Sequence, residues 1–279
     1  MTTSNDRIRK GVSAFYGRAV RSGTGCCSGS GCCGGGDATG VAGFAAQFPG
    51  YDAQAAGLPA DAVANSFGCG NPLAFSEVEP GEVVLDLGSG AGIDLLIAAR
   101  KVGPTGRVIG VDMTDEMVAR ARANAAEAGF ANIDVRKGII EELPVETATV
   151  DWVISNCVIN LSPEKHRVFS EIARVLRPGG RMRVSDIVVE DMPAWAREHM
   201  GLYASCVSGA VSQTEYVEGL AKAGLADIRV LERFPYGQAQ AREILDADPG
   251  ENAASDVPRI ASAIAGKVWS VTFCARKPQ

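Results

Sequence analysis

Short apolar runs and longer amphipathic stretches alternate along the middle of this 279-residue chain. Apolar runs of four to eight residues between turn signals are typical of buried strands, and apolar residues three or four apart are typical of helices. The pattern predicts strands over 82–88, 107–113, 133–138, 150–156 and 181–188. It predicts helices over 92–102, 114–129 and 162–176. Because strand and helix alternate, we expect an α/β fold with a mostly parallel sheet and helices on both faces.

The ends of two helices are marked by local signals. Thr114 is the expected N-cap of the helix that ends at Gly129, and acidic residues follow it in the first turn. Ser162 is the expected cap of the later helix, with Pro163 in its first turn. That helix is expected to end in the RPGG stretch at 177–180.

The chain before residue 82 gives a different pattern. Residues 1–22 have apolar positions at helical spacing, and 59–66 open with a proline followed by small helix formers, so both predict short helices. Residues 22–40 are almost all Gly, Ser and Cys and predict a flexible loop. The glycines and Asn-Pro of 66–72 predict a turn.

The chain after residue 190 completes the expected sheet. A helical stretch is predicted around 192–224, followed by strands at 228–234 and 268–277, with the last strand antiparallel. Residues 239–265 are polar and Ala-rich, and we expect helix and loop there. The expected fold is therefore a Rossmann-like, seven-stranded sheet. Its expected divisions are an N-terminal arm (1–71), a core (72–190), and a substrate-side lid with closing strands (191–279).

Composition excludes several classes of protein. The net charge of −6 and pI near 5.1 argue against a nucleic-acid-binding protein. No apolar run approaches the roughly 18 residues that span a bilayer, and the N-terminus lacks the features of a secretory signal. We therefore expect a cytoplasmic chain without a membrane partner. Its eight cysteines are then expected to be mostly reduced, acting as ligands or redox groups.

The stretch DLGSGAG after the first predicted strand contains the first candidate site. Gly88, Gly90 and Gly92, with Ser89 between, would bring backbone N–H groups close to a ligand at the carboxyl edge of the sheet. Asp112, at the end of the next strand, is placed to accept hydrogen bonds from ribose hydroxyls. Taken alone, such a turn is either a dinucleotide site or only a tight strand-to-helix connection.

Neighbouring residues favour a cationic nucleoside ligand. The carboxylate of Asp86 would repel a pyrophosphate but suits an ammonium and a sulfonium group. Met113 could pack on an adenine. Ile139 and Ile140 could line its slot, and Glu141 could accept from its amino group.

As a set, DLGSGAG, VDM, KGIIEELP, SNCVINL and VLRPGGR resemble the class I S-adenosylmethionine-dependent methyltransferases over about residues 72–190. The resemblance implies that Asp86 and the glycines form the methionine-side loop, that Asp112 holds the ribose, and that Ile139 to Glu141 hold the adenine. It also implies that Asn156 lies beside the methyl group.

Three cysteines indicate which class of substrate accepts the methyl group. Cys69, Cys157 and Cys206 lie in the contexts SFGCGNP, SNCVINL and ASCVSGA, and singly each could be a small buried hydrophobe. Together with the core motifs, these contexts resemble the arsenite methyltransferases over nearly the whole chain. The resemblance implies that the three sulfurs bind one trivalent arsenic atom, taken up as arsenite or its glutathione complex. Soft thiolates suit this soft ion.

The resemblance also implies a mechanism without a general base. The arsenic lone pair would attack the sulfonium methyl, and positioning would supply most of the rate. A thiol pair closing to a disulfide could return arsenic(V) to arsenic(III), and thioredoxin or glutathione would reset the thiols. No tightly bound metal cofactor is expected. Of the two histidines, His166 is expected to be solvated and His199 to be structural.

The remaining cysteines have open roles. Cys26, Cys27, Cys32 and Cys33 form a CC-x4-CC arm that could bind zinc, capture arsenicals or have no fixed role. The resemblance to the arsenite methyltransferases implies that one of the four could pair with Cys69 in a redox step. Vicinal cysteines are poorly spaced for a zinc knuckle. Cys274 is expected to serve packing.

Two other functions remain open. One is methylation of a small organic acceptor such as a quinone precursor, which should survive replacement of Cys157 and Cys206 by serine. The other is a metalloid-sequestering binding protein, which absence of cofactor binding would favour.

Overall fold

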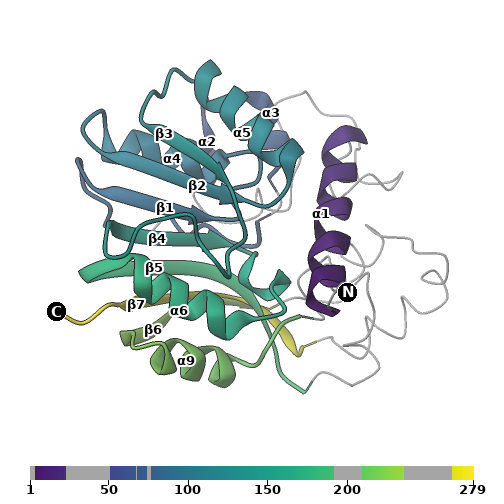
Figure 1. Ribbon diagram of the computed structural model, residues 1–279, viewed down its shortest axis with the longest axis vertical. Coiled ribbons are helices and arrows are strands. Elements are labelled where there is room, and N and C mark those ends of the chain that lie inside the picture. Colours follow the sequence, from purple (N-terminus) through teal and green to yellow (C-terminus); the bar gives the residue numbers. More distant parts are fainter. Residues whose placement is uncertain (1–3, 23–50, 67, 74–76, 192–208, 236–265) are drawn as a thin grey trace.

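A computed structural model of the chain describes residues 4–22, 51–66, 68–73, 77–191, 209–235 and 266–279. Within these residues one seven-stranded sheet has the order β3-β2-β1-β4-β5-β7-β6 (Figure 1). The strands are β1 (Val83–Leu87), β2 (Arg107–Asp112), β3 (Ile133–Lys137), β4 (Val150–Asn156), β5 (Leu176–Val189), β6 (Ala226–Pro235) and β7 (Val268–Arg276). The first five pair in parallel, and β7 is antiparallel to β5 and β6. This confirms the predicted sheet and its antiparallel last strand.

Alternating apolar residues give the sheet a buried core on each face. Along β1, Val84 belongs to one core and Leu85 to the other, because successive side chains of a strand point to opposite faces.

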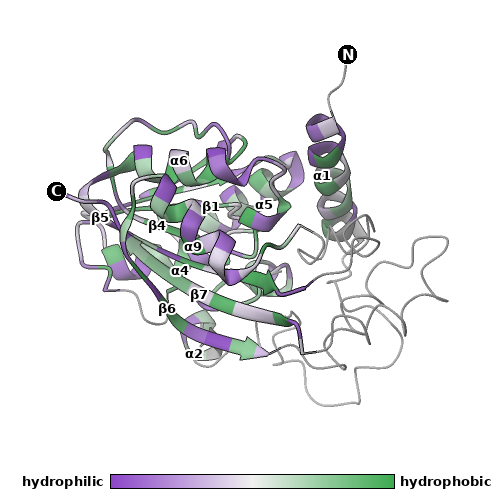
Figure 2. Cartoon of the chain, turned by 90° about the horizontal axis from the view of Figure 1, so that it is seen from below, coloured by the Kyte–Doolittle hydropathy of each residue, from purple (hydrophilic) through white to green (hydrophobic). Residues whose placement is uncertain are grey.

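The helices are α1 (Ser4–Ser22), α2 (Tyr51–Ala55), α3 (Ala60–Ala64), α4 (Ile93–Val102), α5 (Asp115–Glu127), α6 (Lys165–Val175) and α9 (Gln213–Lys222), with a 3-10 turn η2 (Ile159–Leu161). Apolar residues of α4 and α5 pack on one face, and those of α6 and α9 on the other. Figure 2 shows apolar residues along the strands and a mixture of apolar and polar residues along the helices.

The strand order places a ligand site at one edge of the sheet. β1 pairs with β2 on one side and with β4 on the other, so the chain reverses its winding direction between β1 and β4. Open α/β sheets bind ligands beyond the carboxyl ends of the strands at such a switch point. Helix α1 stands at this edge, apart from the two helical layers, and packs against α5 (Figure 1).

Two predicted helix boundaries are wrong. Helix α6 begins at Lys165 with Glu164 as its N-cap residue, not at Ser162. The hydroxyl of Ser162 accepts from the Glu164 N–H at 3.0 Å and donates to Glu141 at 2.7 Å, so it turns the chain before the helix. The RPGG stretch does not end α6 but belongs to β5, where Gly179 and Gly180 pair with the backbone of Lys277.

Most other predicted elements are confirmed where the structure describes them. The helices within 1–22 and 59–66, the central strands and helices, and the two closing strands all form, and α9 lies in the predicted helical stretch. The predicted turn is present at 68–72, and Gly129 follows α5 with a φ of +74°. Apart from Ser22, which ends α1, the predicted loop at 22–40 lies outside the described residues. Residues 192–208 of the predicted helical stretch and the segment 239–265 also lie outside them. The three-part division of the chain stays a prediction. Among the described helices, none has the length and apolar character needed to cross a membrane.

Candidate functional site

A cavity of about 960 Å³, including the part open to solvent, lies beyond the carboxyl ends of β1, β2 and β4. Its walls include residues from each predicted element of the cofactor site. These predicted residues are Asp86, Gly88, Ser89, Gly90, Asp112, Met113, Ile139, Ile140, Glu141 and Asn156. Cys157, predicted as an arsenic ligand, lines the same cavity. Gly92 is not a lining residue, but it precedes α4 with a φ of +96° and so ends the glycine loop. The structure thus brings the predicted set together around one space.

The glycine loop is held by the neighbouring strand. The Gly90 N–H donates to Asp112 Oδ2 at 3.0 Å, and the Thr114 N–H donates to Asp112 Oδ1 at 2.8 Å. Gly88 has a φ of +67°, and a Cβ there would lie 2.5 Å from the Val158 side chain, so only glycine suits this turn. The loop conformation therefore follows from local sequence and one carboxylate.

Three carboxylates, those of Asp86, Asp94 and Asp112, lie near one another at the cavity. Burial raises the pKa of Asp86 well above its usual range, and the charges of Asp94 and Asp112 raise it further. Burial also raises the pKa of Asp112, although hydrogen bonds from Thr114 and Gly90 oppose this effect. Asp86 Oδ2 and Ser89 Oγ are buried and have no hydrogen-bond partner within the part of the chain that the structure describes. Buried polar atoms without partners at a cavity wall suit a ligand that carries a positive charge and N–H donors.

The opposite end of the cavity is apolar with one carboxylate. Ile139 and Ile140 line it, and Glu141 is only 4% exposed. Glu141 Oε1 accepts from Arg9 Nε at 3.1 Å and from Ser162 Oγ at 2.7 Å. The cavity wall is completed by α1, which contributes Arg9, Val12 and Tyr16.

Cys69 and Cys157 are joined in this structure by a disulfide across 88 residues of sequence, with a Cα–Cα distance of 5.5 Å. This pairing differs from the expectation of free thiols. Both cysteines are nearly fully buried. Cys157 has a φ of +61°, a conformation that non-glycine residues seldom adopt and that often marks a functional site. The two predicted arsenic ligands are therefore adjacent, whereas Cys206 lies outside the described residues.

Asn156 holds the turn that carries Cys69. Its Oδ1 accepts from the N–H groups of Cys69 at 2.9 Å and Gly70 at 3.1 Å, and its Nδ2 donates to the Gly70 carbonyl at 2.8 Å. A Cβ on Gly68 would lie 2.2 Å from the Asn156 amide, so this contact requires glycine. Ser270 on β7 donates to the Cys69 carbonyl at 2.6 Å. The amide that sequence reasoning assigned to the cofactor thus also positions the thiol.

Sequence reasoning did not single out Asp186, the buried acid behind the cysteine pair. One oxygen of its carboxylate and the two sulfurs all lie within 4.8 Å of one another. Burial raises the pKa of Asp186 to about 7, although hydrogen bonds from Ile187, Asn160 and Tyr216 oppose the shift. Its place in the sequence SDIV, on a strand interior, is the one signal that could have identified it, because a buried strand position is seldom acidic.

One further acid of the site was not predicted, and the structure also describes some of the remaining histidines and cysteines. Asp94, in the first turn of α4, faces Asp86 and accepts from Asn156 Nδ2 at 3.2 Å, and it was not predicted. His166 is exposed on α6, as expected, and His199 lies outside the described residues. Cys274 is half-buried on β7, and the four cysteines of the CC-x4-CC arm lie outside the described residues.

Comparison with known proteins agrees with this geometry. A family model described as a methyltransferase domain matches residues 78–224. The crystal structure of an arsenic(III) S-adenosylmethionine methyltransferase from Chlamydomonas reinhardtii superposes with a TM-score of 0.66 at 33% identity. The superposition covers 83% of this chain and 74% of that one.

Two curated relatives are arsenite methyltransferases. The arsenite methyltransferase of Halobacterium salinarum is 42% identical over 81% of this chain. The arsenite methyltransferase of Aquipseudomonas alcaligenes is 39% identical over 62% of this chain. The matches span 59% and 51% of those two relatives, so the chain covers little more than half of their length.

Proposed function

Because this chain belongs to the methyltransferase-domain family and, within it, groups with the arsenite methyltransferases, we propose that it methylates trivalent arsenic with S-adenosylmethionine as donor. The observation that carries the proposal is the adjacency of two buried cysteines and a cavity suited to that donor. Cys157 belongs to both, since it lines the cavity and pairs with Cys69. Cys206 is proposed as the third sulfur ligand.

The cavity suits the donor at both ends. The partnerless oxygens of Asp86 and Ser89 can accept from an ammonium group, and the surrounding carboxylates favour a sulfonium. The proposed roles of Asp112 at the ribose and of Ile139 to Glu141 at the adenine follow from their places on the cavity wall. When bound, S-adenosylmethionine supplies an electrophilic methyl group.

The cysteines hold and orient the substrate. In their reduced form, Cys69 and Cys157 are close enough to share one soft ion, and thiolates are soft ligands. Arsenic(III) bound to sulfur keeps a lone pair, which forms the As–C bond as the sulfonium S–C bond breaks. Arsenic is thereby oxidised to arsenic(V), and two thiols that close to a disulfide return two electrons to it.

The proposed co-reactants follow from this cycle. The disulfide between Cys69 and Cys157 must be reduced before arsenic can bind, and we propose glutathione or thioredoxin as the reductant. Arsenite or its glutathione complex is the proposed form of the substrate. The cytoplasmic location expected from the sequence stays a prediction.

A transfer assay tests the proposal. Reduced protein is incubated with arsenite, glutathione and methyl-labelled S-adenosylmethionine, beside a variant with serine at Cys157 and Cys206. We expect label in methylated arsenic for the wild type and none for the variant. If neither transfers label to arsenic while the donor still binds, the arsenic acceptor is wrong and small organic acceptors, such as a quinone precursor, become the better hypothesis. If the donor does not bind at all, a metalloid-binding protein becomes the better hypothesis.

A further inference from the structure

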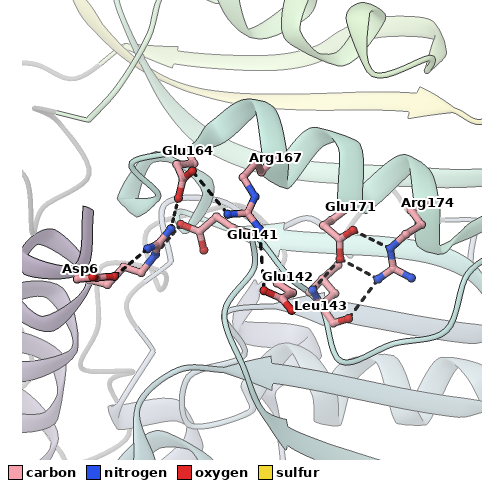
Figure 3. Close-up of polar contacts among 9 residues, drawn as sticks. Asp6, Glu141, Glu142, Leu143, Glu164, Arg167, Glu171 and Arg174 are labelled. Carbon is pink, nitrogen blue, oxygen red and sulfur yellow. Dashed lines mark hydrogen bonds and ion pairs between the residues drawn. The ribbon is translucent and has the colours of Figure 1, made fainter. Parts of the chain in front are cut away.

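Arg9 of α1 links three parts of the molecule at the adenine end of the cavity. Its Nε donates to Glu141 Oε1 at 3.1 Å, its Nη2 donates to Glu164, and its Nη1 lies 3.5 Å from Asp6 Oδ1. Figure 3 shows the side chains of Asp6, Glu141 and Glu164 gathered around this point. Glu141 and Glu164 are 132 and 155 residues away from Arg9 in sequence, so this contact exists only in the folded chain.

The ion pair between Arg9 and Glu141 is largely buried. The side chain of Arg9 is 17% exposed and that of Glu141 is 3% exposed, so the pair is poorly screened by water. Burial alone would lower the pKa of Arg9, but hydrogen bonds and charges from Glu164 and Glu141 outweigh burial and raise it. An arginine can serve two carboxylates at once because its donors form a rigid fork, whereas a lysine presents a single ammonium.

The two donors to Glu141 both use one oxygen. Arg9 and Ser162 bond to Oε1, and neither bonds to Oε2. Glu141 itself lines the cavity, next to the apolar surfaces of Ile139 and Ile140. Arg9 and Ser162 therefore fix the carboxylate through Oε1, and Oε2 carries no bond from either of them.

Resting on the proposed function, we propose that Arg9 is a positioning residue for the cofactor's base. It fixes Glu141 so that Oε2 accepts the exocyclic amino group of adenine. Through Glu164 it also holds α1 closed over the cavity. The first role affects which base is bound, and the second affects how tightly any base is bound. These two roles predict different results for different variants.

Two product analogues separate the roles. S-adenosylhomocysteine presents an amino group to Glu141, and S-inosylhomocysteine presents a carbonyl at the same position. We expect the wild type to prefer the adenosyl compound by about 10- to 100-fold, which corresponds to one hydrogen bond to a buried charged group. Calorimetry of the full chain measures both dissociation constants.

The variants test each contact. Arg9→Met should weaken binding of S-adenosylhomocysteine about 10-fold and reduce the base preference to about threefold or less. Arg9→Lys should recover part of the preference. Glu164→Gln leaves the Glu141 contact in place, so it should weaken both ligands equally and keep the preference.

Arg167→Met is the matched control. Arg167 belongs to the same cluster, since it pairs with Glu142 at 3.9 Å and Glu164 at 3.6 Å, but it does not contact Glu141. We expect it to keep both affinities. If Arg9→Met does not fold, Ser162→Ala removes the other donor to Oε1 and should also lower the preference.

The binding measurements separate a failure of the Arg9 inference from a failure of the proposed function. If Arg9→Met weakens both ligands but keeps the wild-type preference, Arg9 only packs α1 and the inference is overturned. If the wild type binds both ligands equally, Glu141 does not distinguish adenine from hypoxanthine, and the inference is also overturned. If the wild type binds neither ligand, the proposed cofactor is wrong, and the inference is overturned together with it.

Discussion

The cofactor side and the thiol side of this site are assembled in different ways. On the cofactor side, Asp86, the glycine loop and Asp112 lie within two adjacent strands and their connections, and Asp112 holds the loop directly. On the thiol side, Cys69 and Cys157 are 88 residues apart, and they meet through contacts with Asn156, Ser185 and Ser270. A local motif therefore specifies the first, whereas packing across the whole sheet specifies the second.

The single variants Cys69→Ser and Cys157→Ser should have the largest effect. Each should reduce methyl transfer strongly and leave cofactor binding nearly unchanged. The rate of methyl transfer to arsenic should fall by at least about 100-fold, because arsenic loses a ligand and is no longer oriented toward the methyl group. Binding of S-adenosylhomocysteine should stay within about twofold, since serine has nearly the shape of cysteine and the glycine loop, Asp86 and Asp112 are unchanged. Cys274→Ser is the matched control on β7 and should transfer methyl groups normally. Equal loss in all three variants would contradict the separation.

Asp86→Asn should affect the cofactor side first. Removing a buried carboxylate that faces a ligand cation should weaken S-adenosylmethionine binding by about 10- to 100-fold. The pKa of Asp86 is raised by burial and by Asp94 and Asp112, and its ionised form binds the cation, so wild-type affinity should increase as pH rises through that pKa. Titration calorimetry at several pH values measures both effects.

Asp134→Asn is the control for this variant, because Asp134 lies on β3 and pairs with Arg107 and Arg136 outside the cavity. Its cofactor affinity and pH profile should match the wild type. An unchanged pH profile in Asp86→Asn would contradict the assignment.

Asn156→Ala should damage the thiol side through the backbone. It leaves the N–H groups of Cys69 and Gly70 without their acceptor, which should lower the free energy of unfolding by about 1–3 kcal/mol and reduce methyl transfer. Asn132→Ala removes a similar amide that bonds the Gly103 and Gly106 carbonyls away from the site. We expect a comparable loss of stability in urea denaturation but normal transfer. A normal rate in Asn156→Ala would show that the Cys69 turn does not need this amide.

Asp186 should give the stability of the folded chain a dependence on pH. Its pKa is about 7 in the folded chain, against an ordinary value of 3.8, because burial favours the protonated form. The folded state therefore binds more protons, and this group's contribution to stability falls as pH rises from about 4 to about 7. The slope should not exceed about 1.4 kcal/mol per pH unit. The difference between wild type and Asp186→Asn in urea denaturation across this range isolates it, and parallel curves would contradict it.

The fold was predictable because its signals are local and repeated. The run from β1 to β3 alternates strand and helix with clear turns, and the structure follows it closely. The start of α6 was missed because Ser162 donates to Glu141, a residue 21 positions earlier, and sequence spacing does not reveal such a contact. The extension of β5 into RPGG was missed because its partner is the C-terminal segment at Lys277.

The same distinction applies to the site. The glycine loop, Asp86 and Asp112 are found by motif, and three cysteine contexts indicate the thiol side. The roles of Asn156 in holding the Cys69 turn, of Asp186 behind the sulfurs and of Arg9 over Glu141 depend on contacts between distant segments. No periodicity or spacing in the chain encodes those contacts.

The central claim is that Cys69 and Cys157, once reduced, bind one arsenic atom at the edge of the cofactor cavity. X-ray absorption spectroscopy of the reduced full chain loaded with arsenite measures this directly at the arsenic edge. We expect at least two sulfur neighbours around arsenic in the wild type and one fewer in either Cys69→Ser or Cys157→Ser. Arsenic surrounded by oxygen in the wild type, or a sulfur shell unchanged in both variants, would contradict it.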